Sequence, residues 1–194
     1  MKVKDIFSVI NNIAPVNTAL SYDNSGLLIG DWEQTVTKVL VCLDCTPAAV
    51  QKAIEISAQL IITHHPVIFD QLKKVIKEKG NVVFECVSNN ISVISMHTNL
   101  DMAEDGVNDC LADALGLKGV SAITDEEGFT FRKGSLSDEM SADGFARYIK
   151  SRLGGVLRYT DGGKPIKVVA VCGGSGGSEL GLAMECADAL VTAD

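Results

Sequence analysis

Two short apolar segments, each running directly into histidine, constrain this chain more than any other feature. Residues 60–62 lead into Thr63-His64-His65-Pro66, and residues 93–96 lead into His97, which Asp101 follows in the pattern His-x-x-x-Asp; the chain's 3 histidines all lie in these two places. Short β-branched runs of this kind are typical of buried strands. Parallel α/β sheets place their chemistry just outside the carboxyl ends of the strands. Two neighbouring strands would therefore bring both histidine clusters to one pocket.

Predicted helices and strands alternate along the rest of the chain. Apolar periodicity and capping residues indicate helices over residues 4–13, 47–58, 81–88, 107–115, 141–152 and 178–186. Apolar runs indicate strands over residues 38–44, 60–63, 91–96, 129–133, 156–160, 167–172 and 189–192. This alternation predicts an α/β fold with mostly parallel sheets flanked by helices.

The segment 38–63 has a counterpart in the segment 167–192. Each opens on Lys-Val, each predicts a strand, a helix and a second strand, and Thr63 and Thr192 stand at matching positions. The match indicates two similar halves, although two unrelated βαβ units would also match by chance. We therefore expect a first α/β half over residues 1–118, which carries the histidine motifs, and a second over residues 119–194.

The overall charge and hydropathy restrict the classes of partner. The formal net charge of -8 disfavours binding to nucleic acid and to anionic membranes, because an acidic surface repels both. No apolar run approaches the roughly 20 residues needed to cross a bilayer. The first residues lack the apolar core of a signal peptide. We therefore expect a cytoplasmic protein that acts away from membranes.

The 6 cysteines are best explained as small apolar side chains. Most lie within apolar runs, where a free thiol packs as a small hydrophobic group. Cys42 and Cys45 have the Cys-x-x-Cys spacing of redox and zinc sites, but no second pair follows them. We expect structural thiols, with a redox or metal role for Cys42 and Cys45 as the alternative.

His64, His65, His97 and Asp101 together are a candidate site for divalent metal ions. Unprotonated imidazole and carboxylate are ligands that suit zinc, iron, manganese and nickel, and they do not select among these metals. Neighbouring residues of an extended chain point in opposite directions, so His64 and His65 suit two ions, roughly 3.5–4 Å apart. Asp101 would ligate one ion or bridge both, while His97 would act as a ligand, as the partner of a ligand or in proton transfer. The alternative is that these histidines lie in capped turns and bind nothing.

A glycine-rich loop, Gly173–Gly177, follows one predicted strand and precedes a predicted helix. Backbone N–H groups at such a helix start can hold an anion, so Gly174, Ser175 and Gly176 are candidate contacts for a substrate phosphate. The loop lacks the third glycine of a dinucleotide motif and the lysine of a P-loop. A tight turn between strand and helix explains the loop equally well.

Four motifs, taken together, resemble those of a known family. They are residues 21–27 (Ser-Tyr-Asp-Asn-Ser-Gly-Leu), 63–66 (Thr-His-His-Pro), 97–101 (His-Thr-Asn-Leu-Asp) and 174–176 (Gly-Ser-Gly). In this order they are similar to the motifs of the Nif-three-like dinuclear metal-centre family, whose bacterial members carry the name GTP cyclohydrolase I type 2. The resemblance extends over nearly the whole chain, with Tyr22 at a position where the family often has Trp.

The resemblance implies an α/β fold of two similar halves around a dinuclear metal site. It implies that His64, His65 and Asp101 are metal ligands and that His97 lies close to them. It also implies a ring-shaped homohexamer whose sites face an internal cavity. A C-terminal His-x-x-x-Glu completes the site in the family, and we expect it roughly 30–40 residues beyond Asp194. The second half of this chain therefore resembles a family member that is truncated at its C-terminal end.

The function that we favour at this point is a metal-dependent hydrolase that acts on a small molecule. The ions would acidify a bound water, which then attacks an electrophilic carbon or phosphorus. The resemblance implies GTP, a nucleotide, as the substrate. The alternative is a non-catalytic metal-binding or regulatory scaffold that binds partner proteins. Catalysis requires an open, water-occupied position on the metal, which a scaffold does not.

Overall fold

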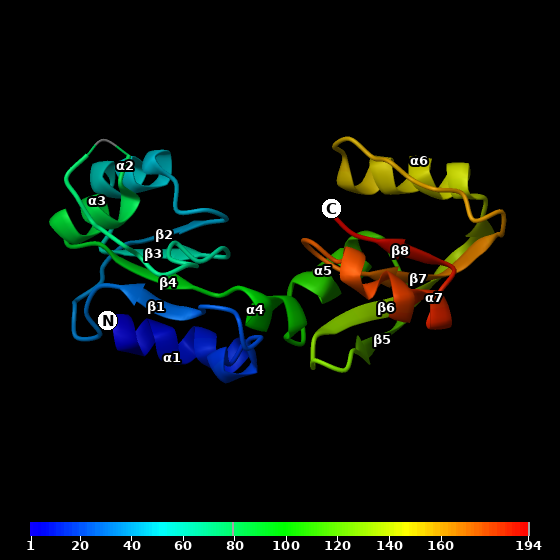
Figure 1. Cartoon of the computed structure of the whole chain (residues 1–194), viewed down its shortest axis with the longest axis horizontal. Coiled ribbons are helices and arrows are strands. Elements are labelled where there is room, and N and C mark those ends of the chain that lie inside the picture. The colour runs from blue at the N-terminus through cyan, green and yellow to red at the C-terminus, as the bar shows by residue number, and fades with distance from the viewer. Residues whose placement is uncertain (79, 194) are drawn as a thin grey trace. The chain divides into compact units, whose positions relative to one another are not determined.

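The computed structural model describes residues 1–78 and 80–193. Its contacts divide the chain into two compact units, Met1–Leu100 and Asp101–Asp194, and each unit is built on one four-stranded sheet (Figure 1). Helices flank both sheets, which confirms the predicted α/β class. The division at residues 118 and 119 rests on the sequence motifs and stays a prediction about where a second half begins.

The first sheet has the strand order β1-β4-β3-β2. Its strands are β1 (Gly26–Ile29), β2 (Val39–Cys42), β3 (Leu60–Thr63) and β4 (Ser92–Ser95). The strands β2, β3 and β4 are parallel, and β1 runs antiparallel to β4. Because Thr63 pairs with Ser95, β3 and β4 end side by side. Both histidine motifs therefore leave the sheet at the same edge.

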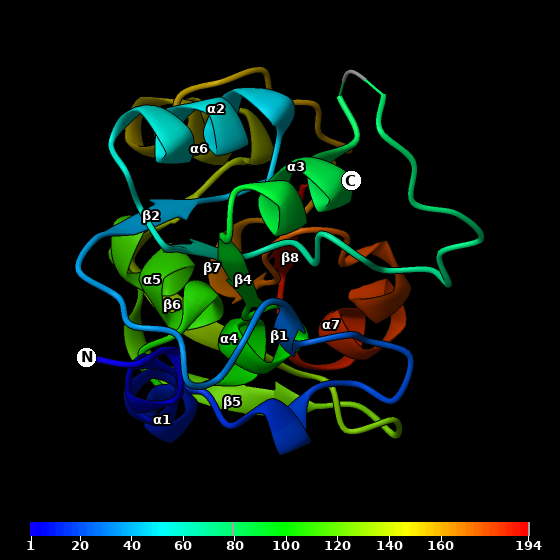
Figure 2. The ribbon, with the colours of Figure 1, turned by 90° about the vertical axis from the view of Figure 1, so that its left-hand side faces the viewer.

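Helices cover both sides of the first sheet. They are α1 (Val3–Ile13), the short 3-10 helix η1 (Val16–Thr18), α2 (Pro47–Glu55), α3 (Val82–Ser88) and, at the boundary of the two units, α4 (Thr98–Met102). Figures 1 and 2 show α1 on the side opposite α2 and α3. The Thr46 hydroxyl accepts the Ala49 N–H at 3.2 Å and caps α2. Buried Ala53 and Cys86 share one apolar core with Ile61 of β3.

The second sheet has the strand order β5-β6-β7-β8. Its strands are β5 (Lys118–Thr124), β6 (Thr130–Met140), β7 (Ile166–Val171) and β8 (Ala189–Val191). The strands β7 and β8 are parallel, whereas β6 is antiparallel to both β5 and β7. This sheet departs from the mostly parallel arrangement expected from the sequence because a tight turn joins β5 to β6 as a hairpin. In that turn the Asp125 carboxylate accepts the N–H groups of Glu127 and Phe129.

The helices of the second unit pack on both faces of its sheet. They are α5 (Val107–Ala114), α6 (Ala142–Leu153), the 3-10 helix η2 (Gly177–Glu179) and α7 (Leu180–Cys186). Val169 of β7 lies in one core with Phe145 of α6, and the next residue, Ala170, lies in another with Ala183 of α7. Successive strand residues point to opposite faces, so a continuous apolar strand serves both helical layers.

Two predictions for the second unit need correction. Residues 156–160, predicted as a strand, form no strand, and Val156 is 93% exposed. Gly154 and Gly155 before them have φ of 74° and 68°, which turns the chain away from extended backbone. The strand β5 escaped prediction because its side chains are almost all exposed and show no apolar alternation.

The matched segments of the sequence have matching topology. The units β2-α2-β3 and β7-α7-β8 each consist of two parallel strands joined through a helix. Among the described residues, no helix has the length and apolar content that crossing a membrane requires.

Candidate metal centre

The three histidines converge although they follow two different strands. His64 and His65 follow β3, His97 follows β4, and one ring nitrogen of each lies within 4.8 Å of the others. The ring centroids lie 4.9 Å (His64–His65), 5.3 Å (His64–His97) and 5.7 Å (His65–His97) apart. Over residues 1–78 and 80–193, no other group of three or more metal-capable side chains gathers this closely. The structure thus brings together the histidines that the sequence singled out.

The backbone at the end of β3 explains how two successive histidines face one site. The N–H groups of His64 and His65 both donate to the Leu43 carbonyl, at 3.2 and 3.0 Å. The Thr63 hydroxyl donates to the His65 carbonyl at 2.9 Å and lies 2.7 Å from the Ser95 hydroxyl. Regular strand pairing therefore ends at Thr63, and the alternation that would send the two rings to opposite faces ends with it.

Each imidazole is held through its Nδ1 atom. The partners are the Met96 carbonyl oxygen for His64 (2.9 Å), Asp44 Oδ1 for His65 (2.7 Å) and Asp23 Oδ1 for His97 (2.8 Å). Carbonyl and ionised carboxylate oxygens only accept hydrogen bonds, so the neutral rings carry their proton on Nδ1. The lone pair of each ring is then on Nε2, as in metal-binding histidines whose other nitrogen donates to an oxygen.

The partners differ in burial, and their effects differ accordingly. The side chains of His65 and Asp44 are 47% and 52% exposed, so water competes for their contact and weakens it. The His97 side chain is 21% exposed and that of Asp23 is 0% exposed, so this contact is shielded from solvent. His97 therefore has the more firmly held ring of the two.

The electrostatics of His64 also favour metal binding. Burial lowers the pKa of His64 below its ordinary value, and the nearby His65 and His97 lower it further. The imidazole is consequently neutral at neutral pH, which is the protonation state that a metal requires.

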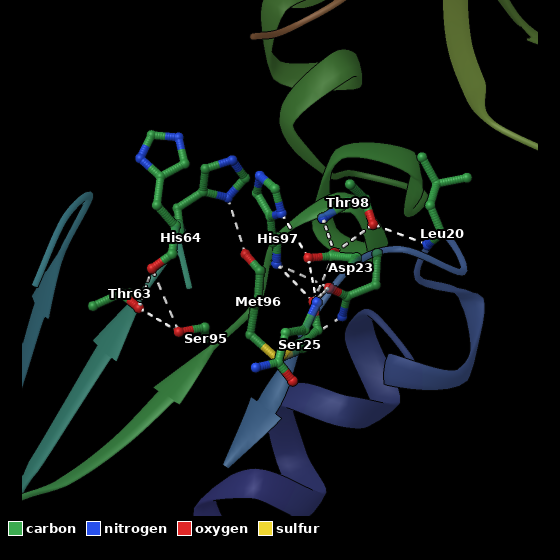
Figure 3. A network of polar contacts seen from close by, with 12 residues as sticks. Leu20, Asp23, Ser25, Thr63, His64, Ser95, Met96, His97 and Thr98 are labelled. Carbon is green, nitrogen blue, oxygen red and sulfur yellow. Dashed lines mark hydrogen bonds and ion pairs between the residues drawn. The ribbon is translucent and has the colours of Figure 1, made fainter. Parts of the chain in front are cut away.

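The carboxylate of Asp23 is the centre of the polar network that supports the site (Figure 3). Besides His97, it accepts the Asn24 N–H at 2.7 Å, the Thr98 N–H at 3.0 Å and the Thr98 hydroxyl at 2.6 Å. Burial by itself raises the pKa of Asp23, but the hydrogen bonds from Thr98, His97 and Asn24 outweigh burial and hold that pKa below its usual range. Asp23 is therefore ionised at neutral pH.

The other predicted site residues lie outside the histidine group. Asp101 is a buried residue of α4 and is not among the side chains that meet within 4.8 Å. Gly174, Ser175 and Gly176 form the turn between β7 and η2 in the second unit. Their roles as metal ligand and as substrate contacts stay predictions.

Sequence reasoning missed the two carboxylates that hold the rings. Asp44 ends the predicted strand over residues 38–44, and Asp23 lies in the motif of residues 21–27; neither position by itself indicates a histidine partner. Asp23 lies 74 positions from His97, and no periodicity or spacing rule connects residues at that distance. The resemblance of residues 21–27 to a family motif was the one signal that pointed to this segment.

A comparison with protein families decides the relationship of this chain. The model of the family described as Duf34/NIF3 (NGG1p interacting factor 3) matches residues 1–194. The chain belongs to the DUF34/NIF3 family. The match confirms the resemblance that its motifs predict.

Relatives of this DUF34/NIF3 member agree. The GTP cyclohydrolase 1 type 2 homolog of Clostridium perfringens is 38% identical over 203 residues, which cover 100% of this chain and 78% of that protein. The homolog of the same name from Staphylococcus epidermidis is 40% identical over 133 residues, 68% of this chain and 36% of that protein. The crystal structure of a hypothetical protein from Staphylococcus aureus matches with a TM-score of 0.90 and 32% identity, and covers 100% of this chain and 79% of that one.

Proposed function

We propose that this DUF34/NIF3 member is a metal-dependent hydrolase that holds two divalent ions, with His64, His65 and Asp101 as ligands. The observation that supports the proposal is the meeting of three imidazoles whose Nδ1 atoms are all engaged by oxygen acceptors. Such an arrangement serves metal binding, because it directs every remaining lone pair outward from Nε2.

The donor set fits a divalent ion. Zinc takes imidazole nitrogen at about 2.0–2.1 Å. One nitrogen of each ring lies within 4.8 Å of the others, which is close enough for the three rings to approach a shared ion. Catalytic zinc sites commonly use three protein ligands, and three imidazoles satisfy one such ion. A second ion needs carboxylate ligands, which is the role that we propose for Asp101.

The chain's own residues supply the remaining functions. A bound divalent ion contributes Lewis acidity and activates water for hydrolysis near neutral pH. Met96 and Asp44 hold the protons of His64 and His65 on Nδ1, so the Nε2 lone pairs of both rings are left for a metal. The ionised Asp23 holds a proton on His97 Nδ1, so His97 Nε2 serves as a further ligand or accepts a proton.

The substrate that we propose is a small molecule, with GTP as the first candidate. The name of the Clostridium perfringens relative, GTP cyclohydrolase 1 type 2 homolog, supports this choice. We further propose that Gly174, Ser175 and Gly176 contact a phosphate of the substrate, since glycine-rich turns before helices commonly hold anions.

Metal binding is tested by elemental analysis of the purified protein. The wild type should retain a divalent metal, and the double variant His64→Ala, His65→Ala should lose it. The double variant Cys42→Ser, Cys45→Ser removes the same number of metal-capable side chains elsewhere in the first unit, and it should retain the metal. Loss of metal from the cysteine variant instead would move the site to the Cys-x-x-Cys segment.

Hydrolysis is tested on the metal-loaded protein with GTP and with a panel of phosphoesters and amides. Turnover that disappears in the histidine variant and persists in the cysteine variant would support the enzyme. Full metal loading with every compound unchanged would refute it.

A second candidate is a metal-binding scaffold that binds partner proteins. The family description, NGG1p interacting factor 3, favours this reading because it names an interaction. The two functions differ in the metal: a catalytic ion keeps a position for water, whereas a structural ion is fully ligated by the protein. Substitution with Co²⁺ and its absorption spectrum with and without added anion would distinguish an open position from a closed one.

We also propose a cytoplasmic location and assembly into a homohexameric ring. Support for self-association comes from the edge strand β2 and from Leu43, the residue that follows it. Val39, Val41 and Leu43 are 37%, 73% and 60% exposed. Exposed apolar side chains along a sheet edge are typical of association surfaces. Light scattering behind size-exclusion chromatography would measure the mass of the assembly.

A further inference from the structure

We propose that Asp23 is the positioning residue of the metal centre. Its buried carboxylate fixes the proton of His97 on Nδ1 and so presents the Nε2 lone pair to the metal as a ligand. The inference deepens the proposed function and rests on it for the metal, but its first claim concerns the protein alone. It is derived from the directions of the hydrogen bonds around Asp23.

A backbone donor sets the direction of the Thr98 hydroxyl proton. The Leu20 N–H donates to Thr98 Oγ1 at 3.0 Å. A backbone N–H can only donate, so the Thr98 hydroxyl accepts there and directs its own hydrogen to Asp23 Oδ2, 2.6 Å away. Figure 3 shows this chain from Leu20 through Thr98 to Asp23 and on to His97.

The remaining neighbours of Asp23 are donors as well. Oδ2 also accepts the Thr98 N–H, and Oδ1 accepts the Asn24 N–H. A carboxylate that accepts on all these sides has no proton to give to His97. The His97 Nδ1 atom, 2.8 Å from Oδ1, must therefore be the donor. The tautomer of His97 follows from fixed backbone groups rather than from the ring's own preference.

The backbone around His97 is held as firmly as its ring. The His97 N–H donates to Asn99 Oδ1 at 2.9 Å, and Asn99 Nδ2 donates to the Ala14 carbonyl at 2.7 Å. Asp23 Oδ2 takes the Thr98 N–H at the start of α4. One carboxylate therefore orients the His97 ring through one oxygen and the following helix through the other.

Asp44 offers a contrast within the same site. It makes the equivalent contact with His65, but it is half exposed, and water can replace it. The Asp23 side chain is 0% exposed, and water can take its place only if the network opens. Removing the charge of Asp23 should consequently have the larger effect on its histidine.

The substitution Asp23→Asn makes the inference testable because it nearly preserves shape. The amide oxygen is expected to take the Oδ2 position, where Thr98 offers two donors and the Ser25 hydroxyl a third at 3.1 Å. At Oδ1 the one fixed donor is the Asn24 N–H, which then loses its acceptor. The NH2 group then faces His97 and can only donate, so Nδ1 must accept and the proton moves to Nε2. The same change of Asp to Asn in serine-protease triads acts by imposing the wrong histidine tautomer.

The experiment is a long-range ¹H–¹⁵N NMR spectrum of the histidine rings in the metal-free protein, with Zn²⁺ titration of the same samples. In the wild type, His97 should show the Nδ1–H tautomer. In Asp23→Asn it should show the Nε2–H tautomer, and Zn²⁺ affinity should fall by about 10–100-fold, the usual effect of losing the partner of a ligating histidine.

Two further variants separate positioning from general loss of structure. Thr98→Val deletes another hydrogen bond to the same carboxylate but leaves the contact with His97, so it should lower stability without changing the His97 tautomer. Asp44→Asn should change His65 and leave His97 as it is.

Three results would overturn the inference: an unchanged His97 tautomer in Asp23→Asn, a tautomer shift of equal size in Thr98→Val, or an unchanged Zn²⁺ affinity in Asp23→Asn beside a wild type that binds Zn²⁺. A wild type that binds no Zn²⁺ would instead refute the proposed metal function. That failure is distinguishable, because the tautomers are read without metal.

Discussion

The ion pair between Arg132 and Asp109 leads to a quantitative prediction about the second unit. Arg132, on β6, has a side chain that is 8% exposed and binds Asp109 of α5 through two contacts, Nε–Oδ1 at 2.7 Å and Nη2–Oδ2 at 2.8 Å. The same guanidinium also donates to the carbonyls of Met102 and Ala103, at 3.1 and 2.9 Å. It therefore connects the segment before α5 to the sheet.

We predict that Asp109→Leu destabilises the protein by about 3 kcal/mol, near the lower end of the range of 3–5 kcal/mol for breaking a buried ion pair. Arg132 cannot escape by losing its proton, since guanidinium stays charged in proteins. The cost falls toward the lower end because the carbonyls of Met102 and Ala103 remain as partners. Leucine and aspartate have the same number of side-chain heavy atoms, so the substitution removes the charge without lengthening the side chain.

The measurement is equilibrium unfolding in urea followed by far-UV circular dichroism. With a slope of about 2 kcal/mol per molar urea, a loss of 3 kcal/mol lowers the midpoint by about 1.5 M. Hydrogen–deuterium exchange of β6 peptides should place the loss in the second unit.

The double variant Asp109→Leu, Arg132→Met is the matched control. It removes both charges, so it should be more stable than Asp109→Leu alone. The reasoning fails if Asp109→Leu costs less than about 1 kcal/mol. It also fails if the double variant loses as much free energy of unfolding as Asp109→Leu and Arg132→Met, measured singly, lose together.

Three further predictions concern local features. The pKa of His64 is lower in the folded chain than in the unfolded chain, so below about pH 6.5 the unfolded chain binds more protons and the protein becomes less stable as the pH is lowered. The metal-free His64→Gln variant should show a flatter stability curve between about pH 7 and 5, and an unaltered curve would contradict the cause assigned. A Cβ at Gly176 would lie 2.5 Å from Cys172 Sγ, so Gly176→Ala should cost about 1–3 kcal/mol in thermal or urea unfolding. Thr46→Ala removes the cap of α2 and should cost about 1 kcal/mol, while Thr46→Ser should keep most of it.

Several features of the fold follow from sequence alone because they depend on neighbours in the chain. Thr46 and Ser141 cap the helices α2 and α6, and each cap is formed with a residue only three positions along. The strands β3 and β4 are short apolar runs, and their ends carry the histidines. The meeting of those histidines was predictable because adjacent parallel strands end at one edge.

Other features depend on which segments meet, and local pattern does not encode this. The antiparallel direction of β6 relative to β5 and β7 was not predictable. The irregular course of residues 156–160 was not predictable either, because an apolar run forms a strand only where a partner strand offers hydrogen bonds. The exposed strand β5 is the converse case: its partner makes it a strand although its side chains do not indicate one.

The sequence by itself determined which side chains this protein has for chemistry and roughly where its strands deliver them. Only the tertiary structure decided how those side chains are protonated and held. The partner of His97 is Asp23, 74 positions away, and its ability to fix a tautomer comes from burial and from donors on Leu20, Asn24 and Thr98. Hydrogen-bond direction is a property of the assembled network, because each donor and acceptor is defined by the groups that surround it in space.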